Sequence, residues 1–228
     1  MVHGNVSLSV IIPALNEEKS IGEVIKKVRN VLEKANIKYE IIVVDGESSD
    51  KTADIARKEG AIVIVERKRG YGRAYKTGFL NAKMDWILTL DADGTYDVAN
   101  IPEHLQYAIS NKLDFITFRR ILQKNSMSIK NRIGNAILNI SLTILFLIRI
   151  KDSQSGMWLI RTKAISLFHL KSDGMAFSEE IKIEAFMHAK AEELNVNYYK
   201  RVGEPKLLAW HDGFKNLLFL FKKRFKHS

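Results

Sequence analysis

The chain has 228 residues, 46% of them hydrophobic, and its 36 lysines and arginines outnumber 26 aspartates and glutamates, which gives a formal net charge of +10. This length buries a sizeable core, and no linker rich in glycine, serine and proline divides it, so we predict a single domain over residues 1–228. The absence of cysteine excludes disulfides and thiol catalysis. The basic charge leaves nucleic acid, anionic lipid and phosphate-bearing substrates as candidate partners.

Acidic or amide side chains follow each of the strongly apolar strands predicted in the first hundred residues. Residues 9–13 lead into Asn16 and Glu17, residues 40–44 lead into Asp45, and residues 86–90 lead into Asp91. Helical segments alternate with these strands, which predicts a parallel sheet whose strand ends share one edge. Open α/β sheets bind their ligands at that edge.

The segments between these strands have recognisable helix and strand patterns. Apolar residues with a 3.6-residue period predict a helix over residues 21–32, and a shorter helix over 52–58 follows a cap at Ser49 or Asp50. A strand over 61–65 precedes a glycine-containing loop that opens a helix over 70–82. That loop lacks the third glycine and the position after the first strand that a dinucleotide fingerprint requires, which disfavours nicotinamide binding.

The segment from Asp91 to Gly94 contains the most informative pair of carboxylates. Asp91 and Asp93 stand at positions i and i+2 of a strand end, and Gly94 lets the chain turn away. Two hard oxygen ligands in this arrangement suit a Mg²⁺ or Mn²⁺ ion shared with a diphosphate. Ordinary turns use the same residue types, so this segment alone does not decide between a turn and a metal site.

Four motifs in the first hundred residues resemble the inverting family 2 glycosyltransferases. They are SVIIPALNEE at 9–18, VVDGESSDKT at 43–52, GYGRAYKTG at 70–78 and DADGTY at 91–96. Further motifs extend the resemblance over almost the whole chain, and they are similar to the branch that transfers a sugar from a nucleotide sugar to dolichyl phosphate. These are Arg120, NRIGN at 131–135, DSQSGM at 152–157 and RVGEPK at 201–206.

The resemblance implies a GT-A-like, Rossmann-related three-layer α/β fold with a mostly parallel central sheet. It places nucleotide-sugar binding on residues scattered through the sequence, namely Pro13, Leu15, Glu17, Asp45, Asp91, Ala92, Asp93, Arg201 and Lys206. It assigns the metal to Asp91 and Asp93 and the acceptor phosphate to Arg120 and Arg132, and these four residues form the expected catalytic group. Phe118 and Arg119 replace the Gly-Ser usual in the family, which leaves the choice between Arg119 and Arg120 open.

The expected chemistry follows from charge. A divalent ion on the paired aspartates, helped by Arg201 and Lys206, stabilises the nucleoside diphosphate as it departs. The acceptor phosphate is already anionic at neutral pH, so it needs no strong general base. We therefore interpret three further carboxylates, Asp152, Glu179 and Glu180, as mainly structural.

Two segments are predicted to meet a membrane surface. Residues 133–148 are apolar but too short to span a bilayer, and Arg132 and Arg149 flank them, which fits either a core helix or a helix in the headgroup region. Because the resemblance implies a lipid acceptor, we favour partial membrane contact over a purely core helix. Residues 214–228 mix aromatic, leucine and basic residues, which fits either an interfacial helix or a helix packed on the sheet with a solvated basic end. No nucleic-acid-binding motif accompanies the charge.

The sequence thus predicts a sugar transferase that acts on polyprenyl phosphate. UDP-glucose, UDP-N-acetylglucosamine and GDP-mannose remain alternative donors. No signal peptide is visible in residues 1–9, so we expect a peripheral protein on the cytoplasmic face of the membrane. The alternatives are a transferase with a soluble or protein acceptor, and a nucleotide-sugar-binding regulatory protein without turnover.

Overall fold

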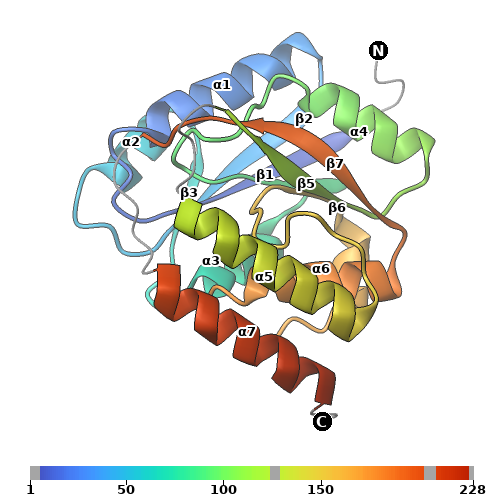
Figure 1. Cartoon of the computed structure of the whole chain (residues 1–228). Helices are drawn as coiled ribbons and strands as arrows, with labels where there is room; N and C mark the ends of the chain where they lie inside the picture. Colours follow the sequence, from blue (N-terminus) through green and yellow to red (C-terminus); the bar gives the residue numbers. More distant parts are fainter. Residues whose placement is uncertain (1–5, 124–128, 203–208, 226–228) are drawn as a thin grey trace.

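The computed structural model describes residues 6–123, 129–202 and 209–225, which fold around one seven-stranded sheet with the order β3-β2-β1-β4-β6-β5-β7 (Figure 1). The strands are β1 (Ser7–Ala14), β2 (Lys38–Asp45), β3 (Ile62–Val65), β4 (Trp86–Thr89), β5 (Phe115–Leu122), β6 (Trp158–Arg161) and β7 (Ala191–Tyr198). The helices are α1 (Ile21–Lys34), α2 (Thr52–Lys58), α3 (Tyr71–Asn81), α4 (Ile101–Ser110), α5 (Ile129–Phe146), α6 (Phe177–His188) and α7 (Ala209–Phe225), with a 3-10 helix at Thr162–Leu167.

The first four strands form the parallel half of the sheet. β1 pairs with β2 on one side and with β4 on the other, and its last residue, Ala14, lies opposite Asp45 at the end of β2. β4 ends at Thr89, one residue earlier than predicted, although the Leu90 amide still donates to the Ile11 carbonyl of β1 at 3.0 Å; the turn begins at Ala92. The three strand ends meet at the same edge, which confirms the expectation drawn from the sequence.

The second half of the sheet contains its one antiparallel element within the described ranges. β6 runs antiparallel to both β4 and β5, whereas β5 and β7 pair in parallel. The sheet is therefore mixed and mostly parallel, as predicted. Because β6 runs backwards, it begins near the strand ends where β4 finishes, and the loop before β6 reaches the same edge.

Helices cover both faces of the sheet. One core cluster lies between the sheet and the face carrying α1 and α4, and a second contains residues of α3 and α6 on the opposite face (Figure 1). The α1 face is apolar with the helical period, and Ile21, Val24, Ile25, Val28 and Leu32 are buried on it. The second cluster is aromatic: Tyr75 stacks on Phe177 with ring centroids 5.9 Å apart.

The glycines of α3 serve close packing. A Cβ on Gly72 would lie 2.6 Å from the Cβ of Phe177, and one on Gly78 would lie 2.4 Å from Ile11 Cγ2. Gly70 adopts a φ of 150°, and a Cβ there would come within 2.3 Å of the Asp173 carbonyl oxygen. This motif therefore brings α3 against β1 and against the segment before α6.

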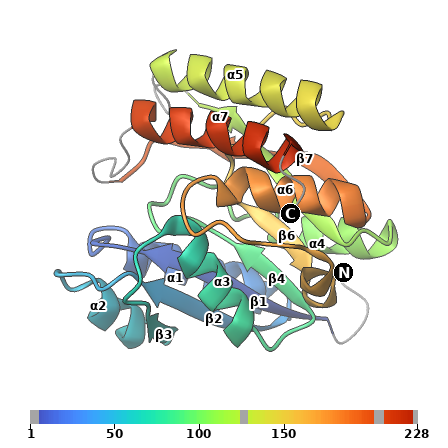
Figure 2. The same cartoon turned by 90° about the horizontal axis from the view of Figure 1, so that it is seen from below.

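α5 and α7 form an outer pair that packs beyond α6. Both figures show these two helices side by side and pointing in the same direction (Figure 2). A third core cluster joins them to α6 and includes Leu142, Ile183 and Leu220. α7 thus packs on other helices, so the expectation that it packs on the sheet is wrong.

Helix capping differs slightly from the prediction. α2 spans the predicted residues, but its N-cap is Lys51, so neither Ser49 nor Asp50 occupies the cap position. Asp50 lies one residue further out, and its carboxylate accepts a hydrogen bond of 2.9 Å from the Thr52 amide. It satisfies one free amide of the first turn from outside the cap.

Candidate active site

Asp93 lies in the turn after β4, buried and held by hydrogen bonds. Its Oδ1 accepts bonds from the Thr95 amide at 3.1 Å and from the Thr95 hydroxyl at 2.7 Å. Its Oδ2 lies 3.3 Å from Nη1 of Arg201. The carboxylate is 4% exposed, so its charge is stabilised by these groups instead of by water.

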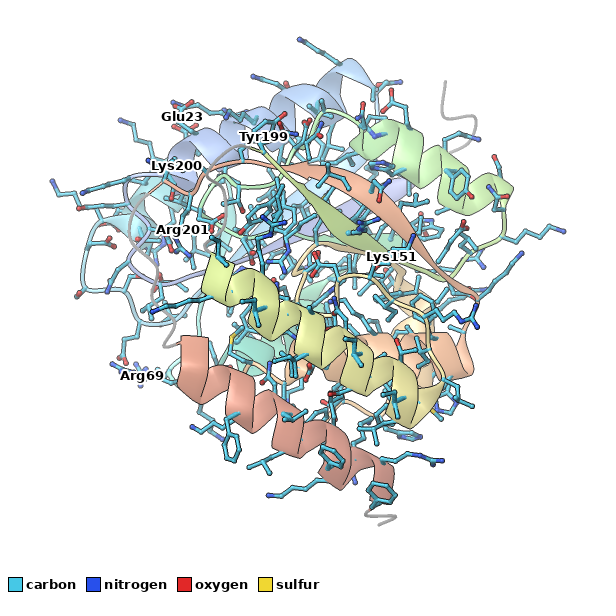
Figure 3. All side chains as sticks on the ribbon, in the orientation of Figure 1. Glu23, Arg69, Lys151, Tyr199, Lys200 and Arg201 are labelled. Carbon is cyan, nitrogen blue, oxygen red and sulfur yellow. The ribbon has the colours of Figure 1, made fainter. Side chains whose placement is uncertain are left out.

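Arg201 links Asp93 to a residue far away in the sequence. Its Nη2 donates to Glu17 Oε1 at 2.5 Å, which joins the segment after β7 to the turn after β1. Figure 3 shows Arg201 just beyond β7, on the same side of the molecule as Glu23 of α1. Glu17 lies outside α1, whose N-cap is Ser20. Its Oε1 forms this ion pair, and its Oε2 accepts a hydrogen bond of 3.4 Å from the Ser20 hydroxyl, so the carboxylate also contacts the start of the helix.

Asp91 lies in an aromatic environment. The Tyr75 hydroxyl donates to its Oδ1 at 3.4 Å, and a Cβ on Gly156 would lie 3.0 Å from the same oxygen. Burial and, after it, the negative charge of Asp93 raise the pKa of Asp91 to about 7, although Arg120 and Arg201 oppose the shift. Burial and the charge of Asp91 also raise the pKa of Tyr71, whose hydroxyl lies against Gly156.

The aspartate pair fits a divalent cation. The charge of Asp93 raises the pKa of Asp91, and a positive ion between the two carboxylates would relieve this repulsion; hard oxygen donors are what Mg²⁺ and Mn²⁺ prefer. Within the part of the chain that the structure describes, no cluster of three or more His, Cys, Asp or Glu side chains is arranged to hold a metal.

Arg120 belongs to a buried ion pair. Its Nε and Nη2 each donate to the Asp152 carboxylate at 2.7 Å, and its backbone amide donates to the same carboxylate at 3.0 Å. Its guanidinium lies over the Tyr198 ring, 5.3 Å from the centroid. The charge of Arg120 also opposes the raised pKa of Asp91, so this arginine lies close enough to act on the aspartate pair.

Other predicted nucleotide-binding residues gather where β1 and β2 end. Pro13 is half-buried in β1, Leu15 is 38% exposed, and a Cβ on Gly46 would lie 3.7 Å from Leu15 Cδ1. Asp45 is buried, and its two oxygens accept bonds from the amide and hydroxyl of Ser48. Its carboxylate therefore also shapes its own turn.

The remaining predicted residues fall into different classes. Ala92 is buried in the first core cluster, so its side chain serves packing. Arg132 lies exposed in the first turns of α5, and no contact described by the structure joins it to Asp91 or Arg120. Lys206 lies outside the described residues.

The sequence did not reveal which buried side chains surround and support the site. Lys182 and Glu179 of α6 are fully buried, and Tyr71, Tyr75 and Tyr96 enclose Asp91. The tyrosines lie in motifs of the sequence, Tyr71 and Tyr75 in the glycine motif and Tyr96 at the end of DADGTY, but their contact with Asp91 was not predicted. Lys182 gave no signal, because charged residues in a helix are usually on the surface, whereas Glu179 is one of the carboxylates interpreted above as structural.

The comparisons with known proteins agree with this architecture. The sequence matches the profile "Glycosyl transferase family 2" over residues 9–168. It is 33% identical over 219 residues to the low-salt glycan biosynthesis hexosyltransferase Agl6 of Haloferax volcanii, covering 94% of this chain and 53% of that protein. It is 30% identical over 202 residues to the dolichyl-phosphate hexose transferase of the same organism, covering 88% of this chain and 86% of that protein. The chain thus spans about half the length of Agl6.

Solved structures show the same fold. Mannosyl-3-phosphoglycerate synthase from Rubrobacter xylanophilus superposes with a TM-score of 0.78 at 17% identity, over 98% of this chain and 77% of that one. A second match is glucosyl-3-phosphoglycerate synthase from Mycobacterium tuberculosis in complex with Mn²⁺, UDP-glucose and phosphoglyceric acid. It superposes with a TM-score of 0.76 at 17% identity, over 98% of this chain and 81% of that one. The predicted GT-A-like α/β fold is confirmed. Because the profile covers most of the sequence, and a relative of similar length shares 30% of aligned residues, the chain belongs to glycosyl transferase family 2.

Proposed function

We propose that this chain transfers one hexose from a nucleotide sugar to polyprenyl phosphate, with inversion and with a divalent metal ion. One observation carries the proposal: the aspartate pair after β4 is influenced by two arginines, Arg201 bonded to Asp93 and Arg120 acting on Asp91. A site that joins two phosphate-bearing substrates needs such positive charge around its metal ligands.

The donor diphosphate belongs with Asp93 and Arg201 in this proposal. Asp91 and Asp93 would hold the metal, and when bound the ion supplies electrophilic stabilisation of the departing diphosphate. We assign Arg201 to the same phosphates, because its buried Nε has no hydrogen-bond partner among the described residues. A ligand phosphate would satisfy that donor. The solved relative with Mn²⁺ and UDP-glucose supports a nucleotide-sugar donor on this fold.

The acceptor phosphate belongs with Arg120. Its Nε and Nη2 donate to Asp152, which fixes the plane of the guanidinium, and no hydrogen bond from Nη1 to another described residue competes with a ligand there. A phosphate monoester oxygen is already anionic, so orientation and charge neutralisation replace a general base. The resemblance to a dolichyl-phosphate hexose transferase supports a lipid phosphate as acceptor. Arg132 remains a second candidate for the same phosphate.

The outer helix pair supports a membrane location for the acceptor. Isoleucines 133, 137, 140 and 144 of α5 are each at least 50% exposed, and Phe214, Leu218, Phe221 and Phe225 of α7 are at least 42% exposed. The described side chains of both helices include no acid, whereas Lys130, Arg132, Lys215, Lys222 and Arg224 are exposed. Apolar rows bordered by positive charge fit an anionic lipid surface. Within the described ranges, no helix is long and apolar enough to cross a membrane.

A reconstituted transfer assay tests the proposal. The purified chain is incubated with Mn²⁺ or Mg²⁺, radiolabelled UDP- and GDP-sugars, and anionic vesicles with or without polyprenyl phosphate. We expect a lipid-extractable product that requires the metal and the polyprenyl phosphate. Transfer to phosphoglycerate or another soluble acceptor instead would replace the lipid acceptor, and donor binding without turnover would indicate a regulatory protein.

A further inference from the structure

Lys182 is a charged residue with no place in the chemistry described above. It lies in the middle of α6 with 0% of its surface exposed. Its amine donates to the carbonyl oxygens of Ser153 at 2.6 Å and Ser155 at 2.7 Å, and to the Ser178 hydroxyl at 3.1 Å. A lysine is almost never fully buried unless its charge or its donors are needed, and here two donors serve one loop.

That loop, residues 152–156, touches the candidate site at both of its ends. At the first end, Asp152 holds Arg120 through two hydrogen bonds of 2.7 Å. At the other end, Gly156 lies so close to Asp91 that a Cβ would come within 3.0 Å of its carboxylate. The position of this loop therefore sets the position of Arg120 relative to Asp91.

Side chains from other elements fix the rest of the loop. The side-chain oxygen of Asn139 in α5 accepts a hydrogen bond of 2.8 Å from the Ser153 amide. The Tyr96 hydroxyl accepts one of 2.8 Å from the Gly156 amide. Gln154 donates to Glu179 at 2.9 Å. The carbonyls of Ser153 and Ser155 point to the interior beneath the loop, where Lys182 lies.

Two other donors share this support but do not replace the lysine. The Trp158 indole nitrogen donates to the Ser155 carbonyl alone, at 3.0 Å. The Ser178 hydroxyl lies 3.1 Å from both carbonyl oxygens, but one hydroxyl hydrogen serves a single acceptor at a time, whereas the amine serves both at once. Burial lowers the pKa of Lys182 to about 7, partly offset by Asp152. An amine that loses its proton still carries two N–H groups, so it can serve both carbonyls in either state.

We propose that Lys182 is a positioning residue: it holds the 152–156 loop from below and so, through Asp152, orients the Arg120 guanidinium toward the acceptor phosphate. This inference rests on the acceptor role of Arg120 in the proposed function. It predicts a selective defect. Loss of the amine should weaken the use of the acceptor and leave donor binding intact, because Arg201 contacts Glu17 and Asp93, which lie outside this loop.

The test compares Lys182→Met with Ile181→Ala. Methionine keeps most of the length but removes every donor, whereas Ile181 is the equally buried neighbour on α6 and packs in the aromatic core cluster. We expect Lys182→Met to raise the KM for polyprenyl phosphate by about tenfold or more, with the calorimetric Kd for UDP and Mn²⁺ within about twofold of wild type. Ile181→Ala should lower the Tm and leave that KM unchanged.

Ser178→Ala covers the case in which Lys182→Met does not fold. It removes a smaller part of the same support, and we expect a rise of about threefold in the acceptor KM. An unchanged acceptor KM in the folded variants, or an equal loss of donor affinity, would overturn the inference. These results are distinct from failure of the proposed function, in which the wild-type chain itself transfers nothing to polyprenyl phosphate.

Discussion

The edge that carries Asp91 and Asp93 differs in one basic respect from the outer pair of helices α5 and α7. At the strand ends, charged side chains are buried, and each finds a partner of opposite charge or a hydrogen-bond donor. On the outer pair, large apolar side chains face away from the core, such as Ile144 at 69% exposure and Phe225 at 72%. Charged side chains are usually exposed and large apolar side chains are usually buried, so the two regions depart from this rule in opposite directions. The stability of the fold alone explains neither departure.

The largest effect is expected at the strand edge. Asp93→Asn keeps the shape but removes the charge that a hard cation requires, so we expect transfer to fall on the order of 1,000-fold, or about 4 kcal/mol. Mn²⁺ binding measured by calorimetry in the presence of UDP should be lost as well. Asp97→Asn, a change of the same kind in the following segment, is the matched control and should retain both. Activity that persists in EDTA would contradict the metal site.

A second change probes the buried charges themselves. Asp152→Asn leaves the Arg120 guanidinium, 10% exposed, without its counter-charge, so we expect a loss of about 3 kcal/mol in the free energy of unfolding. Urea denaturation measures this loss. The exposed pair of Arg161 and Asp114, 3.5 Å apart, gives the control, and Arg161→Gln should cost less than about 1 kcal/mol. Equal costs would show that the Arg120 pair is not a buried support.

A third change tests the outer helices. The double variant Ile137→Glu/Ile144→Glu places two negative charges on the exposed row of α5, so we expect binding to anionic vesicles to weaken by about 30-fold, or about 2 kcal/mol. Co-sedimentation measures binding, and donor binding should be unaffected. Ile62→Glu, at a 49% exposed isoleucine of β3, should leave vesicle binding unchanged. Equal weakening by both variants would place lipid contact elsewhere.

The smallest effect concerns pH. Because the pKa of Asp91 is raised from 3.8 to about 7, the metal-free folded chain keeps a proton that the unfolded chain has released between these values, and its stability falls as pH rises through that window. Asp91→Asn removes this loss. We expect the variant to gain about 1 kcal/mol relative to wild type between pH 5 and pH 8, measured by urea denaturation.

Asp97→Asn provides the control for the pH experiment. Although burial opposes the shift, hydrogen bonds from Ala99, Asn197 and Tyr199 lower the pKa of Asp97, so it is ionised in both states above pH 5. Its relative stability should not change between the two pH values. A pH-dependent gain at this position would show that general charge, not burial at Asp91, is responsible.

Much of the fold was predictable from the sequence because its signals are local. Strands β1 and β2 are apolar runs, α1 carries its buried residues at the helical period, and α2 was predicted over its observed residues. A motif that directly follows a strand lies at the end of that strand. Asp45, Asp91 and Asp93 could therefore be assigned to one edge of the sheet. The exposed row of α5 was also anticipated from a segment too short to span a bilayer.

The tertiary structure decided which distant groups meet. The ion pair between Arg201 and Glu17 joins residues 184 positions apart, and Asp152 meets Arg120 across 32 positions. Lys182 looks in the sequence like a surface charge on a helix, yet it and Glu179 are buried against the loop of residues 152–156. Periodicity records which face of an element is apolar, but the burial and pairing of a charge depend on long-range packing, which a single chain segment does not encode.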